Sequence, residues 1–182
     1  MKFSTTSHTL TATTAGATQA LSAGCKEVSL FAEAAMDFNV VPGAEGTLTA
    51  AVKTAAAADV KEVRTVTTAG SFGVGDVVRV VVASNNVDFT VTTADRTLTA
   101  AGIRAAIVAN STVNALVDSS VSGDVVTLTR KTANTAFTLT TAYVSRSVNH
   151  HIGASERLQV EVLPGSTIRA KADGGTLNIS EL

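Results

Sequence analysis

The residues that could support catalysis or metal binding are few, and histidine is the clearest case. His8 lies near the start of the sequence, and His150 and His151 are adjacent. Neighbouring residues of a strand point to opposite faces, so the pair is poorly placed to hold one metal ion. No His-Glu-x-x-His or cysteine-rich spacing accompanies it. We therefore expect no metal site, and a loop or strand-entry role for the pair.

A glycine cluster and the many serines give no better support for an active site. Gly70, Gly73 and Gly75 precede an expected strand, whereas a phosphate-binding loop follows a strand and opens a helix. No serine lies in Gly-x-Ser-x-Gly or pairs with a histidine and an acid at recognisable spacing. The acidic residues show no calcium-loop spacing and no carboxylate pair suited to glycoside hydrolysis. We expect a protein that is not an enzyme and that binds no cofactor.

Cys25 is the single cysteine of the chain. It has no second thiol for an intramolecular disulfide and no nearby histidine to activate it, so we predict a small buried residue at the start of a strand. Residues 21–25 look like a lipoprotein cleavage box. However, residues 4–18 are mostly polar where a signal sequence needs an apolar core, and we reject that interpretation.

The charge balance argues against nucleic acid and membrane as partners. Lys and Arg number 14 and Asp and Glu 15, for a net charge of -1, whereas a nucleic-acid binder needs clustered cations. The longest apolar runs are interrupted by arginines and are too short to span a membrane. The arginines of the middle of the chain are interpreted as solvated or ion-paired: Arg64, Arg79, Arg96, Arg104 and Arg130.

The composition predicts how such residues would be positioned. The chain has 182 residues, of which 45% are hydrophobic and 16% charged, enough apolar surface for one globular domain or two small ones. Thr and Val are abundant, and the only prolines are Pro42 and Pro164. Because β-branched residues favour strands, we predict a mainly β protein.

Both ends of the chain show the two-residue period of strands. Val28, Leu30 and Ala32 alternate with polar residues and Phe31, and a second such run ends at Pro42-Gly43. Near the other end, residues 158, 160 and 162 are apolar and alternate with Gln159 and Glu161, before a Pro164-Gly165 turn. The composition of residues 1–25, rich in Thr, Ser, Ala and Gly, fits an extended arm or short edge strands better than a helix, and we expect the order of this segment to depend on a partner.

The middle of the chain predicts a compact unit with the order β-β-β-α-β-β. Asn85-Asn86 is interpreted as a two-residue hairpin loop, which would place Val82 opposite Phe89 and Val80 opposite Val91. Ala100, Ile103, Ala106 and Ile107 form one apolar helical stripe. Thr97 or Thr99 is the expected cap of that helix, and Asn110 and Ser111 its expected end.

These elements predict a discontinuous organisation. Residues 26–57 and 144–182 together supply enough strands for a β-sandwich or jelly-roll-like domain, but neither piece does so alone. Residues 58–143 are then an inserted small α+β module, and the Ala-rich stretch 47–58 is interpreted as a connector.

The C-terminal residues carry a resemblance to a known class of proteins. The run contains Gly153, Glu156-Arg157-Leu158, Pro164-Gly165-Ser166 and Gly175-Thr176-Leu177-Asn178-Ile179. It resembles the ending of small structural proteins of tailed-bacteriophage virions, and Lys26-Glu27-Val28 resembles their beginning. The similarity covers roughly the first 55 and last 35 residues. The middle residues are similar to small modules of phage tail and other virion proteins.

The resemblance implies a particle component that works by burying surface. Capsid decoration, or cement, proteins sit on the capsid exterior, often as trimers, and bridge neighbouring capsid subunits. We therefore expect a virion protein on the capsid surface, made in the host cytoplasm. Its partners would be the major capsid protein or another virion protein, and copies of itself in a homotrimer.

Two alternatives remain open. The protein could be a head- or tail-fibre adhesin module in which the inserted residues bind a host receptor or glycan. Tyr143 is the only Tyr and Trp is absent, which weakens this alternative because sugar sites commonly stack on such rings. A neck or tail-completion protein is the other alternative.

Overall fold

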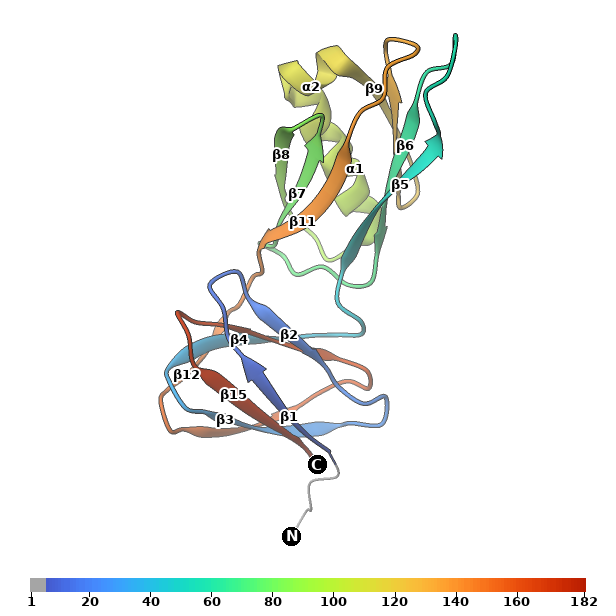
Figure 1. Cartoon of the computed structure of the whole chain (residues 1–182). Helices are drawn as coiled ribbons and strands as arrows, with labels where there is room; N and C mark the ends of the chain where they lie inside the picture. The colour runs from blue at the N-terminus through green and yellow to red at the C-terminus, as the bar shows by residue number, and fades with distance from the viewer. Residues whose placement is uncertain (1–5) are drawn as a thin grey trace. The chain divides into compact units, whose positions relative to one another are not determined.

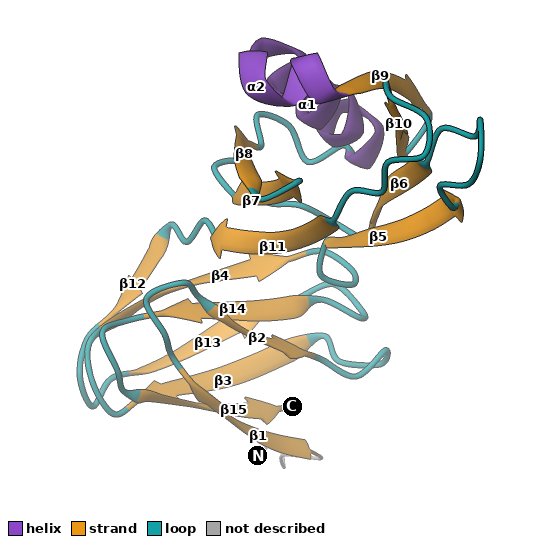
Figure 2. Ribbon diagram, turned by 45° about the horizontal axis from the view of Figure 1, so that its top comes forward, coloured by secondary structure: helices purple, strands orange, loops and turns teal. Residues whose placement is uncertain are grey.

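The computed structural model describes residues 6–182 and divides into two compact units. The first consists of the residues that precede Gly46 and those that follow Val144, and we call it the sandwich unit. The second, Gly46–Val144, contains the helices of the described chain and is called the helical unit. Figure 2 shows the helices in purple, together with strands of the helical unit in orange. The protein is thus mainly β with a small helical insertion, as predicted.

The sandwich unit is built from short antiparallel strands. Their bounds are β1 Thr6–Thr11, β2 Ala17–Ala20, β3 Glu27–Ala32, β4 Met36–Val41, β12 His150–Ile152, β13 Arg157–Glu161, β14 Thr167–Lys171 and β15 Thr176–Glu181. They form two four-stranded sheets within residues 6–182, with the orders β1-β15-β3-β13 and β12-β4-β14-β2. Figure 1 shows β1 in blue beside β15 in red, so the first and last described strands are neighbours.

The two sheets pack face to face because each strand alternates apolar and polar residues. In β3, Val28, Leu30 and Ala32 are fully buried, as the two-residue period predicts. They share one core with Phe38 and Ile168 of the opposite sheet. This shared core makes the unit a β-sandwich.

Within the described residues, the N-terminal segment forms short edge strands, one of the two structures that its composition predicts, and not an extended arm. Thr6–Thr11 pairs along its length with β15, and Ala17–Ala20 pairs with β14. Leu10 and Ala12 are buried in the sandwich core. The composition does not distinguish edge strands from an arm, because the hydrogen bonds of both strands come from strands near the other end of the chain. Residues 1–5 of the expected arm lie outside the described residues.

The helical unit combines two sheets with two helices. Its elements are β5 Thr47–Thr54, β6 Val63–Ala69, β7 Val77–Val82, β8 Asn85–Thr90, α1 Arg96–Ala109, α2 Ser111–Leu116, β9 Val117–Ser122, β10 Val125–Arg130 and β11 Leu139–Ser145. The sheet orders are β5-β6-β10-β9 and β11-β7-β8. Ile103 and Ile107 of α1 are buried in the core together with Val80 and Leu128, which confirms the predicted helical stripe.

The expected connector belongs to this unit instead. Thr47–Thr54 is strand β5 and pairs with β6, so the division falls at Gly46 and not at residue 58. The residues of β5 are exposed except for half-buried Leu48 and Ala50, which is why the stretch lacks an apolar period. Helix α2 and strand β9 were also not predicted, because each has few buried apolar residues.

The predicted hairpin register is wrong. The turn residues between β7 and β8 are Ala83 and Ser84, both with positive φ, and Val82 lies opposite Asn85. Val80 therefore faces Val87, where we expected Val91. Asn favours positive φ in general, but here the side chain of Asn85 donates to the carbonyls of Val82 and Ala83 and closes the turn from the strand beside it.

The helix cap also differs from the prediction. Asp95 is the N-cap of α1, and its carboxylate accepts hydrogen bonds from the backbone N–H groups of Thr97 and Leu98. Thr99 instead donates its hydroxyl to the Asp95 carbonyl. Asp caps as well as Thr, so composition alone did not distinguish them. Asn110 ends α1 as expected and also caps α2.

Candidate functional site

His8 lies on a different strand from the adjacent His150 and His151, and each of the three has its own contact. His8 on β1 contacts the Glu181 carboxylate at 3.0 Å, and His151 on β12 contacts Asp37 at 2.9 Å. His150 packs its ring against Phe38, with centroids 5.4 Å apart. Within residues 6–182, no three His, Cys, Asp or Glu side chains gather as a metal site would require.

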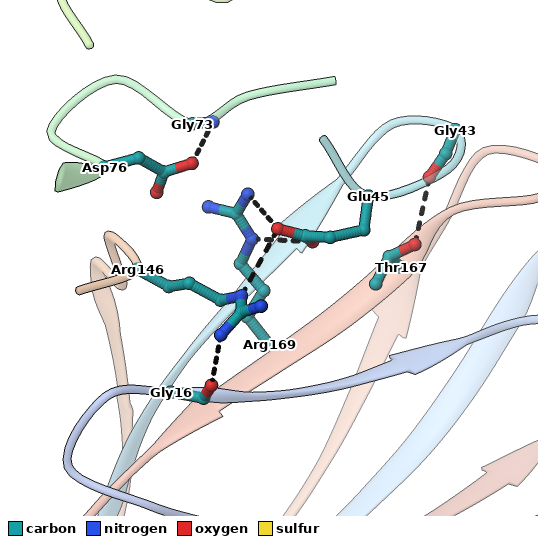
Figure 3. A network of polar contacts seen from close by, with 8 residues as sticks. All are labelled: Gly16, Gly43, Glu45, Gly73, Asp76, Arg146, Thr167 and Arg169. Carbon is teal, nitrogen blue, oxygen red and sulfur yellow. Dashed lines mark hydrogen bonds and ion pairs between the residues drawn. The ribbon is translucent and has the colours of Figure 1, made fainter. Parts of the chain in front are cut away.

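The glycine cluster is a turn ahead of β7. Buried Asp76 accepts a hydrogen bond from the Gly73 N–H at 2.8 Å, as Figure 3 shows, and so closes the loop on itself. Gly75 has a φ of +91°, which a side chain would oppose. No helix follows this turn, and the sheet continues directly into Val77–Val82.

Cys25 is buried at the start of β3, as predicted. Burial raises the pKa of its thiol, and the nearby negative charge of Glu181 raises it further. Its sulfur also lies 3.3 Å from the Glu27 carbonyl oxygen. A raised pKa keeps the thiol protonated, so Cys25 is poorly suited to act as a nucleophile.

Most of the middle arginines are ion-paired. Arg64 contacts Glu62 at 2.9 Å, Arg79 contacts Asp88 at 2.6 Å and Arg96 lies 3.8 Å from Asp124. The hydrogen bond from Arg79 lowers the pKa of Asp88 and keeps that carboxylate charged. Arg104, by contrast, lies exposed on α1.

A buried ion pair lies where the chain leaves and re-enters the sandwich unit. Arg169 on β14 is fully buried, and its Nε and Nη2 atoms donate to the two carboxylate oxygens of Glu45 at 3.0 and 2.7 Å. Glu45 also lies 3.4 Å from the Arg146 Nε, and Arg146 donates to the Gly16 carbonyl (Figure 3). Because Glu45 precedes Gly46 and Arg146 follows Val144, the ion pairs hold the two connections together.

The sequence does not predict the ion pairs of Glu45 with Arg146 and Arg169. Arg169 alternates with Ile168 and Ala170, which lie in the sandwich core, so its side chain leaves the opposite face of the sheet. Its partner is 124 residues away. The alternation predicts the face but cannot predict the partner, because only the tertiary fold brings Glu45 to it.

The surface feature best suited to a partner is on strand β13. It is the last strand of its sheet, and two hollows flank it. One hollow, of about 750 Å³, is lined by Val162, Leu163 and Pro164 with Leu182 and several charged residues. The other, of about 290 Å³, lies between β13 and β4. Leu163 is 62% exposed and Leu158 is 40% exposed. We call this region the β13 edge.

Comparison with known proteins adds no assignment. No family model, no curated protein and no solved structure matches the chain. In the part of the chain that the structure describes, no helix has the length and apolar character of a membrane span. The exposed apolar residues of the β13 edge make it a candidate site for contact with another protein.

Proposed function

We propose that the protein is a non-enzymatic structural protein of a tailed-bacteriophage virion, specifically a capsid decoration (cement) protein that stabilises the head by bridging capsid subunits. The sequence resemblance suggests the class. The observation that carries the proposal is the hollow at one end of the β13 edge, where Leu163 remains exposed beside Val162 and Pro164.

The energetic argument is that exposed apolar side chains favour burial. Covering a leucine side chain contributes about 1.5–3 kcal/mol, so a few such residues supply much of a modest interface. The major capsid protein, or another virion protein, is the proposed partner. The protein would work at the capsid surface, after synthesis in the host cytoplasm, without nucleic acid or membrane.

The direct test is co-sedimentation with capsids that lack the protein. We expect it to bind assembled capsids more tightly than free capsid subunits, because bridging needs two neighbours. Leu163→Asp should weaken capsid binding by about tenfold or more, since it places a charge in the contact. Val52→Asp is the matched control, because Val52 is also exposed, at 51%, but lies in the helical unit.

The same pair of variants tests the adhesin alternative. Several apolar residues of the helical unit are exposed: Val52, Val60, Val74 and Leu98. If the protein ignores capsids but binds host cells or glycans, and Val52→Asp rather than Leu163→Asp reduces that binding, the function is receptor binding. Location at the neck or tail in a reconstructed particle would favour the completion-protein alternative.

A further inference from the structure

One side of strand β13 has no neighbouring strand among the residues that the structure describes. Within the described residues, β13 pairs with β3 alone and ends its sheet. Natural edge strands are usually protected by proline, by a bulge, by short length or by charged side chains; the charges of β13, Arg157 and Glu161, are opposite in sign and can attract a second strand as well as repel one. Here the pairing with β3 is regular over all five residues, and the residues on the core side are Leu158 and Val160. Such an edge is open to strand addition.

The register shows which backbone groups are available. Val162 donates its N–H to the Lys26 carbonyl at 2.9 Å, and Ala32 donates to the Glu156 carbonyl at 3.3 Å. Hydrogen-bonded pairs alternate along an antiparallel ladder, so Leu158 and Val160 also direct their backbone groups to β3. The N–H and C=O groups of residues 157, 159 and 161 therefore point outward.

Two of the residues whose backbone groups point outward have opposite charges, and they lie at equal distances along the strand from Gln159. Arg157 stacks its guanidinium 5.3 Å from the Phe31 ring, and no carboxylate of the described residues forms an ion pair with it. Glu161 lies directly opposite Glu27 on β3, a like charge, and likewise has no ion pair among residues 6–182. Gln159 lies midway between the two charges.

We infer that β13 pairs with β13 of a second copy of this chain, antiparallel, about a two-fold axis at Gln159. In this register each Arg157 lies opposite Glu161 of the second copy, and Gln159 lies opposite its own counterpart. All the outward backbone groups of the strand are then paired. If the two-fold axis passed through residue 158 or 160 instead, fewer outward backbone groups would find a partner. Gln159 would then lie opposite a charged residue.

The contact is self-complementary, as a two-fold interface must be. Each added arginine also supplies Glu161 with an opposite charge directly across the strands. Leu158 and Val160, at the rim of the hollow that Phe38 and Val40 line, would be covered by the same residues of the second copy. The product is a dimer, in place of the trimer that the sequence resemblance implies.

A strand of five residues buries little area, so the dimer should be weak in dilute solution. Copies bound side by side on a capsid would experience millimolar effective concentrations, at which weak pairing is sufficient. The pairing itself does not depend on capsid binding. The two proposals can therefore fail separately.

The first experiment measures the mass of the full chain by light scattering up to about 0.5 mM, a range that detects millimolar affinities. We expect the mass to rise from 18.5 kDa toward twice that value. Arg157→Glu and Glu161→Arg should each weaken the dimer about tenfold, because each creates two like-charge pairs. The combined variant should restore it. Both residues are exposed, so we expect the melting temperature of each variant to be unchanged. An unchanged melting temperature would exclude misfolding as the cause of weaker pairing.

The second experiment tests the register by cross-linking. In a hydrogen-bonded antiparallel pair the Cα atoms are about 5.5 Å apart, within disulfide range. Gln159→Cys should therefore form an intermolecular disulfide under mild oxidation, whereas Leu163→Cys, which is exposed but off the axis, should not.

A protein that stays monomeric at the highest concentration, forms trimers, or fails to regain pairing in the combined variant would overturn the inference. Monomers that still bind capsids would leave the proposed function intact. Dimers that ignore capsids would leave the pairing intact and overturn the proposed function.

Discussion

The two units of the molecule use buried charge differently. In the sandwich unit, a fully buried arginine, Arg169, depends on a carboxylate from a distant loop, Glu45. In the helical unit, the buried acids Glu62 and Asp76 accept backbone N–H groups of Phe137 and Gly73 and so fix loops, around an otherwise apolar core. Glu62 also pairs with Arg64, so both units contain ion pairs; they differ in that Arg169 of the sandwich unit is fully buried, whereas Arg64 is partly exposed.

The largest effect should come from a charge in the apolar core of the helical unit. Val80 is 1% exposed, so Val80→Asp would bury an unpaired carboxylate and cost more than about 4 kcal/mol. Hydrogen exchange of the full chain should then show loss of protection in β7 and α1. Strands β3 and β15 should stay protected.

Val81→Asp is the matched control for that substitution. Val81 is half-buried and points to the other face of β7, so we expect a much smaller loss. If Val81→Asp were the more destructive of the two, the observed facing of β7 would be wrong.

The corresponding change in the sandwich unit is Glu45→Gln. Glu45→Gln removes the charge that fully buried Arg169 contacts through two hydrogen bonds, and removing one partner of a buried ion pair typically costs about 3–5 kcal/mol. Denaturant unfolding should show the loss, with protection reduced in β14 and β4. Glu33→Gln, at an exposed position, is the control and should change stability little. A loss confined to the helical unit would contradict the comparison.

A smaller effect should follow from the close packing of α1 on β8. A Cβ added at Gly102 would lie 2.1 Å from the Phe89 ring, so Gly102→Ala must displace that ring. Overpacking costs about 1–3 kcal/mol, and the helix propensity of alanine offsets about 1 kcal/mol of it. The double variant Gly102→Ala with Phe89→Leu should recover part of the stability in thermal unfolding. No recovery would show that the ring is not the cause.

The sequence predicts the local features of both units but not the contacts between residues that are far apart in the chain. The alternation in β3 and the stripe of Ile103 and Ile107 give the correct faces, because periodicity is local. The turn at Ala83 was missed because nothing in those small residues favours positive φ. The pairing of Arg169 with Glu45 required contacts across 124 residues.

The smallest predicted effect concerns the acid dependence of the sandwich unit. Glu181 is buried, and its Oε1 accepts hydrogen bonds from the Ser22 N–H at 2.9 Å and from the His8 ring at 3.0 Å. Burial alone would raise the pKa of Glu181, but the hydrogen bonds from Ser22 and His8 outweigh it, and the net effect is a lowered pKa.

A lowered pKa means that the folded state binds fewer protons than the unfolded chain in the acid range. The stabilisation is therefore complete above the ordinary glutamate pKa of about 4.3 and is lost as the pH falls through the lower pKa of the folded state. Glu181→Gln should cost about 1 kcal/mol at neutral pH and flatten this acid dependence. Glu33→Gln should leave it unchanged. Urea unfolding from pH 3 to 7, followed by hydrogen exchange in β15, would measure both quantities. If the free energy of unfolding fell equally with pH in Glu181→Gln and in the parent protein, other carboxylates would be the cause of the acid sensitivity.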